Sequence, residues 1–363
     1  MRTVSLRSGA RVPALGLGTW GLGEDPGRRA ADVRAVRSAL DLGYRLIDTA
    51  EMYGEGGAEE VVGQALAEAM RAGGLSREDV FVVTKVYPHN ASRRGTLEAN
   101  ERSLQRLGLD HVDLYLLHWP GQHPLAHTVG AMRELVGAGR VSHWGVSNFD
   151  VSDMADLEGV AGDGPACATN QVYFSMTERG PEFSLLPWLR QRHMPLMAYS
   201  PIDQGALAHD DAVAAVAERH GVTAAQVALA WLLSREGAFA IPKAAKEAHQ
   251  RENLAAASLV LTEADLADLD EAHPPPQRKQ PLAMLSGRVG SPGSPSAPWT
   301  PSSGATSGVA RASAIHTGNG SVHATWRAGR ASSSRPVSTS PCSSHTPKAS
   351  GISCGSAMPA GNT

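Results

Sequence analysis

Eight short apolar runs alternate with amphipathic stretches over the first 285 residues, and this alternation limits the possible fold more than any other feature. Each run is bounded by turn residues, as is typical of buried strands. The runs that predict strands cover residues 14–18, 45–48, 80–84, 112–117, 142–146, 169–173, 195–199 and 239–242. Apolar residues at three- and four-residue spacing predict helices between them, for example at 30–42, 58–71, 96–107, 128–138 and 263–272.

A strand and a helix repeated eight times predict an α/β fold of the (β/α)₈ TIM barrel type, with parallel strands that close on themselves. An open doubly wound sheet is the alternative, but it is expected to carry a glycine-rich turn that leads directly into a helix. The glycines of residues 16–21 are followed by no helical pattern. Residues 4–6 and 11–13 flank a turn at 7–10 and predict an N-terminal β-hairpin that caps one end of the barrel.

The composition changes at Ser286. Residues 286–363 are rich in Ser, Gly, Ala, Pro and Thr and contain six Lys and Arg residues but no Asp or Glu. Such a segment buries too little apolar surface to offset the entropy of ordering, so we expect a barrel domain at 1–285 and a disordered, low-complexity tail at 286–363. The tail is either a frame-shifted or read-through extension, or a flexible basic segment that contacts an acidic partner.

The net charge argues against nucleic acid as a partner. The whole chain carries −3, and because the tail contributes +6, the body carries −9. Phosphate binding needs clustered Lys and Arg instead. No apolar stretch approaches the roughly 20 residues that cross a bilayer, and no signal peptide begins the chain, so we expect a cytoplasmic protein without membrane contact. The three cysteines match neither a disulfide framework nor a zinc site.

Four polar side chains, Asp48, Tyr53, Lys85 and His118, lie where apolar runs end. Taken singly, each has a structural explanation as a helix cap, a packed ring, a solvated charge or a core histidine. Together they fall at successive carboxyl ends of strands, where barrel enzymes place their chemistry. A cationic lysine beside a phenol is expected to lower the phenol's pKa from about 10, and a carboxylate would hold that lysine. The set therefore predicts reduction of a carbonyl group, with the tyrosine as proton donor.

The chain resembles the aldo-keto reductase family, and among its bacterial members those that reduce methylglyoxal. Matching motifs extend over residues 1 to about 285. They are Leu-Gly-Leu-Gly-Thr-Trp at 15–20, Gly-Tyr-Arg-Leu-Ile-Asp-Thr-Ala at 43–50, Val-Val-Thr-Lys-Val at 82–86, Asp-Leu-Tyr-Leu-Leu-His-Trp-Pro at 113–120, Gly-Val-Ser-Asn-Phe at 145–149, Asn-Gln-Val at 170–172, Ala-Tyr-Ser-Pro at 198–201 and Ile-Pro-Lys at 241–243.

The resemblance implies a cofactor, NADPH with NADH possible, that lies extended on the barrel, and a small carbonyl substrate. It implies that Tyr53 is the general acid, tuned by Lys85 and Asp48, with His118 orienting the carbonyl. We expect the protein to be a monomer. The implied cofactor-binding residues are Thr19, Trp20, Ser147, Asn148, Gln171, Ser200, Ile202, Gly205, Lys243, His249, Glu252 and Asn253. The implied substrate-binding residues are Trp20, Tyr53, His118 and Trp119, with Tyr87 close by.

Two positions depart from the family pattern. Members often carry Ser or Thr after Ile-Pro-Lys, and an Arg six residues past the Lys that holds the 2′-phosphate of NADPH; here these places hold Ala244 and His249. Lys243 still supplies a charge, so we expect preference for NADPH. Tyr173 is the ring expected near the nicotinamide. Because no long carboxyl-terminal lid is evident, we expect an open site that accepts many small aldehydes.

Two other functions fit parts of the pattern. A barrel could bind NADPH without catalysis and regulate a partner, although all four chemical residues are present. A metal-dependent barrel hydrolase could use Asp48 and His118, but no His-x-His pair or comparable cluster follows a strand, so we expect no metal.

Overall fold

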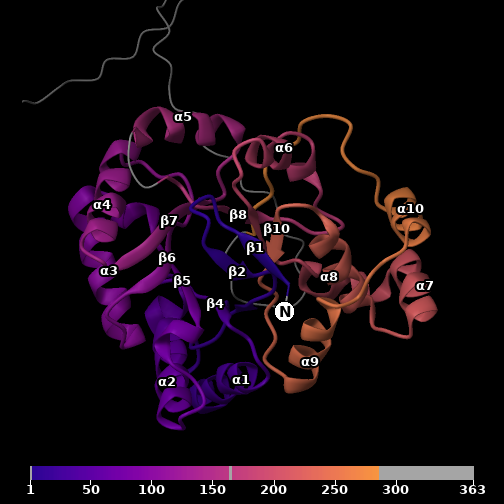
Figure 1. The fold of residues 1–363 in the computed structure, drawn as a ribbon, viewed down its shortest axis with the longest axis horizontal. Coiled ribbons are helices and arrows are strands. Elements are labelled where there is room, and N and C mark those ends of the chain that lie inside the picture. Colours follow the sequence, from indigo (N-terminus) through magenta and orange to yellow (C-terminus); the bar gives the residue numbers. More distant parts are fainter. Residues whose placement is uncertain (1, 163–165, 286–363) are drawn as a thin grey trace, which may run out of the picture. The chain divides into compact units, whose positions relative to one another are not determined.

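The computed structural model of the chain describes residues 2–162 and 166–285, which form a curled sheet of eight parallel strands surrounded by helices (Figure 1). The strands follow one another around the sheet in chain order. They are β3 (Leu17–Gly18), β4 (Leu46–Asp48), β5 (Phe81–Val86), β6 (Val112–Leu117), β7 (Val141–Ser147), β8 (Asn170–Tyr173), β9 (Leu196–Tyr199) and β10 (Ala238–Ala240). The expected (β/α)₈ barrel is confirmed, whereas the tail expected at 286–363 lies outside the described residues.

The barrel closes between its first and last strands. Leu15 forms a parallel bridge with Ala240, and Gly18 forms one with Lys243. Strand β3 is shorter than the expected run at 14–18. Its last residue, Gly18, permits the backbone to pass very close to the segment after β10. A Cβ atom at Gly18 would lie 2.7 Å from the carbonyl oxygen of Ile241, too close for any other residue without movement of the backbone.

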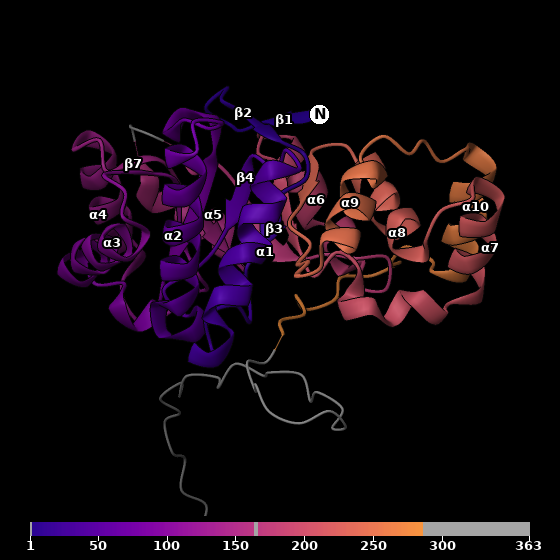
Figure 2. The same cartoon turned by 90° about the horizontal axis from the view of Figure 1, so that it is seen from below.

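The expected N-terminal hairpin is also confirmed. Strand β1 (Thr3–Ser5) pairs antiparallel with β2 (Arg11–Pro13), and Gly9 adopts a φ of +87° in the turn between them. Val12 is fully buried, so the hairpin covers apolar side chains at the amino ends of the strands. In Figure 2 the hairpin lies along the upper edge of the barrel.

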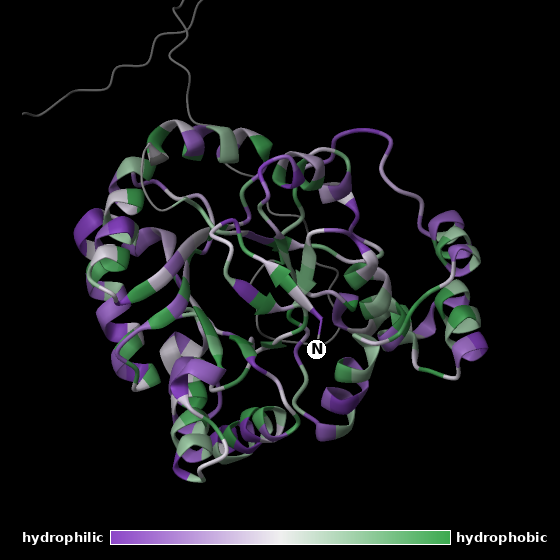
Figure 3. Ribbon diagram, viewed as in Figure 1, coloured by the Kyte–Doolittle hydropathy of each residue, from purple (hydrophilic) through white to green (hydrophobic). Residues whose placement is uncertain are grey.

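The helices lie outside the sheet, and hydrophobic and hydrophilic residues alternate along their ribbons (Figure 3). Four of them cover the first four stretches for which helices were expected, within about three residues at each end. The helices are α1 (Arg29–Asp41), α2 (Gly57–Arg71), α3 (Arg93–Leu107), α4 (Leu125–Gly137), α5 (Val151–Ala161), α6 (Leu185–Arg190), α7 (Asp211–His220), α8 (Ala224–Ser234), α9 (Glu247–Ala256) and α10 (Glu263–Ala272). In the described part of the chain, none is long and apolar enough to cross a membrane.

Candidate active site

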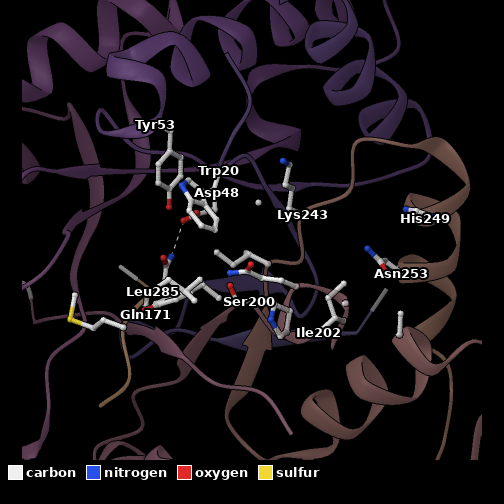
Figure 4. A pocket seen from close by; sticks show the side chains of 18 of the residues that line it. Trp20, Asp48, Tyr53, Gln171, Ser200, Ile202, Lys243, His249, Asn253 and Leu285 are labelled. Carbon is white, nitrogen blue, oxygen red and sulfur yellow. Dashed lines mark hydrogen bonds between the residues drawn. The ribbon is translucent and has the colours of Figure 1, made fainter. Parts of the chain in front are cut away.

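A cavity of about 760 Å³ lies at the carboxyl ends of the barrel strands. Figure 4 shows its lining side chains in a row, from Tyr53 and Asp48 at one end to His249 and Asn253 at the other. The strand ends position the first group, and helix α9 positions the second. The cavity is therefore elongated, with a group of ionisable side chains at each end.

Asp48, Tyr53, Lys85 and His118, here called the tetrad, come together at one end of the cavity. Lys85 is fully buried, and its Nζ donates hydrogen bonds to Asp48 Oδ2 at 2.7 Å, to the carbonyl oxygen of Thr49 at 2.8 Å and to the Tyr53 hydroxyl at 3.2 Å. The carboxylate and the lysine therefore form a buried ion pair directly beside the phenol. Strand β5 supplies Lys85, strand β4 ends at Asp48, and Tyr53 begins the short 3₁₀ helix η2 (Tyr53–Gly56).

His118 follows strand β6 and lines the cavity beside Tyr53. The centroids of the two rings lie 5.9 Å apart at an interplanar angle of 73°. Burial, and then the charge of Lys85, hold the pKa of His118 well below its usual value. The imidazole is therefore neutral at pH 7, and a neutral ring can donate one hydrogen bond to a carbonyl oxygen.

The pKa of Tyr53 differs in direction from the sequence-based expectation. Burial, followed by the negative charge of Asp48, raises the pKa of this phenol well above 10. The net shift is thus opposite to the expected lowering, because removal from water penalises the phenolate. The consequence suits a proton donor, since the phenol keeps its proton at neutral pH.

Burial also acts on the ion pair. It raises the pKa of Asp48 and lowers that of Lys85, while the attraction between the two charges opposes both shifts. Asp48 has a second donor, because Gln171 Nε2 donates to its other oxygen at 2.8 Å. Charges taken out of water need such additional hydrogen bonds. The ion pair is thus held in one geometry from both sides.

Amide and aromatic groups line the cavity next to the tetrad. Asn148 donates through Nδ2 to the His118 carbonyl oxygen at 3.0 Å, and its Oδ1 accepts from the Tyr199 hydroxyl at 3.0 Å. The Tyr199 ring stacks on Tyr173, with centroids 5.6 Å apart and planes at 19°. Tyr199 lines the cavity and Tyr173 lies behind it, so the flat ring beside the amides is Tyr199. Sequence reasoning missed this placement, although Tyr199 ends strand β9 as Asp48 ends β4.

Two of the expected cofactor-binding residues lie behind the cavity wall. Thr19 is fully buried and donates through Oγ1 to the Asp48 carbonyl oxygen at 2.9 Å. Ser147 is almost fully buried, and its hydroxyl accepts from Asn148 at 3.1 Å. Neither side chain lines the cavity. Each instead makes a hydrogen bond to a residue that does, Asp48 or Asn148.

The loop after β9 forms the middle of the cavity wall. It contains Ser200, Ile202 and Gly205, all of which line the cavity, and continues into η6 (Asp203–His209). Ser200, Asp203 and Gln204 adopt positive φ angles of 50–54°, which are uncommon for residues other than glycine. Asp203 accepts hydrogen bonds from the Tyr173 hydroxyl and from Thr177 Oγ1. These two bonds hold the unusual backbone of the loop against the segment after β8.

The far end of the cavity carries ionisable and amide side chains. Lys243, His249 and Asn253 line it (Figure 4), as does Glu252, and the residues numbered 249, 252 and 253 belong to helix α9. Ala244 is buried beneath them. Lysine and histidine around an open space can hold an anionic group such as a phosphate.

Aromatic and apolar side chains surround the opening beside the tetrad. Trp20 and Trp119 line the cavity, as expected, and so do Met284 and Leu285. The segment after α10 therefore returns to the site, where Leu285 lies near the Tyr199 hydroxyl. This segment adds two apolar side chains to the cavity wall, and the expected openness of the site stays a prediction.

Comparison with known proteins agrees with this arrangement. The sequence profile of the Aldo/keto reductase family matches residues 14–274. Methylglyoxal reductase YeaE of Escherichia coli (strain K12) is 48% identical over 279 residues, which cover 76% of this chain and 95% of that protein. Glyoxal reductase of Bacillus subtilis (strain 168) is 35% identical over 268 residues, which cover 74% and 91%. The crystal structure of an aldo/keto reductase from Klebsiella pneumoniae in complex with NADP and acetate matches with a TM-score of 0.72 and 45% identity, over 78% of this chain and 99% of that one.

Proposed function

Because the chain belongs to the aldo/keto reductase family and is an oxidoreductase of that family, we propose that it uses NADPH to reduce small aldehydes and ketones, among them methylglyoxal, to alcohols. The observation that carries this proposal is the contact of Lys85 Nζ with the Tyr53 hydroxyl, made beside a cavity whose other end carries Lys243 and His249. Together they supply a proton donor and a place for a phosphate-bearing cofactor.

The cavity fits a nicotinamide dinucleotide. The side-chain amides of Asn148 and Gln171 can hold a carboxamide, and the Tyr199 ring offers a flat surface for a nicotinamide. The loop from Ser200 to Gly205 would hold the pyrophosphate, and Lys243 with His249 would hold the phosphate of the adenosine end. The bound dihydronicotinamide would supply a hydride to the carbonyl carbon.

The tetrad would supply the proton. His118, as a neutral ring, would donate a hydrogen bond to the substrate oxygen and orient it. As negative charge develops on that oxygen, the Tyr53 hydroxyl would give up its proton, and Lys85 would stabilise the phenolate that forms. Asp48 would keep Lys85 in place. A positioned general acid of this kind contributes about 10²- to 10⁴-fold in rate.

The substrate end favours small compounds. Trp20, Trp119 and Leu285 narrow the space beside Tyr53 with apolar surface. Such walls exclude water and accept a small carbonyl compound without charged groups. Methylglyoxal and glyoxal meet this description, and two relatives carry the names of reductases for them.

The proposal is tested by mixing the purified protein with NADPH and a series of small aldehydes and following the absorbance of the reduced nicotinamide. We expect consumption of NADPH with methylglyoxal, slower consumption with NADH, and none without an aldehyde. A strong chelator should leave the rate unchanged. Lack of turnover with every aldehyde, in a protein that binds NADPH, would instead support a catalytically silent, regulatory barrel.

A further inference from the structure

Glu59 is a carboxylate in the layer between the barrel and its helices, outside the cavity. It lies in the first turn of α2 and is fully buried. Its Oε1 accepts a hydrogen bond from Thr84 Oγ1 at 2.6 Å, and its Oε2 accepts one from Arg106 Nε at 2.6 Å. Glu59 is paired with Arg106, but even a paired buried charge often adds no stability over an apolar side chain, so Glu59 invites an explanation beyond packing.

The position of Thr84 places Glu59 behind Lys85. Successive side chains of a strand point to opposite faces, and Thr84 and Lys85 are neighbours on β5. Lys85 faces the tetrad inside the barrel, so Thr84 faces the helix layer, where Glu59 receives its hydrogen bond. Lys85 therefore has one carboxylate in front of it, Asp48, and a second behind its strand.

The electrostatics of Lys85 also link it to Glu59. Burial lowers the pKa of Lys85, and both Asp48 and Glu59 oppose that shift. Of the two oxygens of Glu59, Oε1 faces the strand, while Arg106 occupies Oε2 on the side of α3. The guanidinium group of Arg106, which balances the charge of Glu59, thus lies on the side of Glu59 away from β5.

Other ionisable groups surround this layer. They are Glu51 in the loop after β4, Tyr115 on β6, Arg102 and Arg106 on α3, and Asp32 on α1, which accepts from the Gly23 N–H. Tyr115 pairs with Thr84 in the β5–β6 register and shares its side of the sheet. Glu51 accepts hydrogen bonds from the Tyr87 N–H and from Asn90, so its charge is engaged elsewhere.

We propose that Glu59 is a positioning residue for Lys85: its charge helps to keep that lysine an ammonium ion, and its hydrogen bond to Thr84 holds the segment of β5 that aims the lysine at Tyr53. This inference rests on the proposed function, in which Lys85 stabilises the phenolate of Tyr53. The competing explanation is that Glu59 only ties α2, α3 and β5 together. In that case removing its charge would not alter the protonation of Lys85.

The test follows the titration of Lys85 directly, by NMR of protein labelled with ¹³C at lysine Cε. The chain has only five lysines, and the variant Lys85→Arg identifies the resonance. Glu59→Gln keeps an acceptor for Thr84 but removes the charge, so the pKa of Lys85 should fall by about 0.5–1 pH unit. Arg106→Gln removes the counter-charge and should raise it. The matched control is Glu60→Gln, next in sequence but half exposed and paired with Arg29, which should change nothing.

The two variants shift in opposite directions, so either one tests the inference if the other fails to fold. Unchanged titration of Lys85 in the folded variant or variants would overturn it. The alkaline limb of kcat/KM for aldehyde reduction should move in the same directions as the NMR titration. The NMR readout requires no turnover, so a wild-type protein without reductase activity would refute the proposed function while the titration still decides the role of Glu59.

Discussion

The ammonium group of Lys85 donates a hydrogen bond to the hydroxyl oxygen of Tyr53, 3.2 Å away. Because the lysine is the donor in this pair, the phenol must direct its own proton elsewhere, and the cavity is the space that Tyr53 lines. In the proposed reaction the same contact would stabilise the phenolate oxygen after that proton has gone. One hydrogen bond would thus both direct the proton of Tyr53 toward the substrate and stabilise the phenolate that remains.

Replacing Tyr53 by phenylalanine removes only this hydroxyl. We expect kcat/KM for aldehyde reduction to fall by about 10²- to 10⁴-fold, the usual contribution of a general acid. The affinity for NADPH, measured by quenching of protein fluorescence, should change little, because the amide and cationic groups of the cavity are intact. Turnover within a few-fold of wild type would show that another group donates the proton.

Replacing Asp48 by asparagine leaves Lys85 charged and buried without its partner. The free energy of unfolding should drop by about 3–5 kcal/mol at neutral pH, as measured by urea denaturation. In the folded state the pKa of Lys85 lies below its unfolded value, so the unfolded chain binds more protons between the two pKa values and stability rises with pH in that window.

The loss of unfolding free energy in Asp48→Asn should therefore shrink as the pH approaches about 10, where Lys85 in the unfolded chain also loses its proton. The exposed Asp156 on α5 provides the control. Asp156→Asn should change stability by about 0.5 kcal/mol or less at any pH. A loss at Asp48→Asn that is independent of pH would indicate a purely steric effect.

The barrel could be predicted because its strands are buried on both faces and are therefore continuous apolar runs. Strand β6 occupies residues 112–117, the same residues as the run that predicted it. The first strand is the exception, because only Leu17–Gly18 has strand geometry and the closure depends on glycines whose close approach to the last strand is a property of the folded barrel.

The tetrad could be predicted for the same reason, since strand ends are visible in a sequence. Its electrostatics could not. The direction of the pKa shift at Tyr53 depends on how completely the barrel excludes water, which only the folded structure shows. Met284 and Leu285 also escaped prediction, because the segment after α10 has no periodic pattern that would indicate where it returns.

The neutral state of His118 gives a pH prediction. Since burial and Lys85 hold its pKa well below the usual value, the ring should stay neutral from about pH 8 down to about pH 6. We expect kcat/KM for an uncharged aldehyde to be flat over this range. A decline near about pH 6.5 that disappears in His118→Gln would contradict this assignment.

The hydrogen bonds to Asp203 give a prediction about cofactor release. Tyr173→Phe keeps the stacking on Tyr199 but removes the donor that holds the loop of Ser200 and Asp203. A hydrogen bond to a charged group contributes about 1.5–3 kcal/mol, so NADPH should dissociate about 10-fold faster or more in stopped-flow displacement. Thr177→Val, which removes the other donor, should act in the same direction. Unchanged release in both variants would show that the loop is held by other contacts.

His249 gives a prediction about cofactor preference. It lines the end of the cavity together with Lys243, and an arginine in its place would add a permanent charge and two parallel donors for a phosphate. His249→Arg should raise the ratio of kcat/KM for NADPH to that for NADH by about 10-fold, chiefly through a lower KM for NADPH. Ala255→Arg adds the same charge to an exposed position of α9 and should leave the ratio unchanged. An equal response of the two variants would mean that general attraction, rather than contact with the 2′-phosphate, governs the preference. No response in either would place that phosphate away from His249.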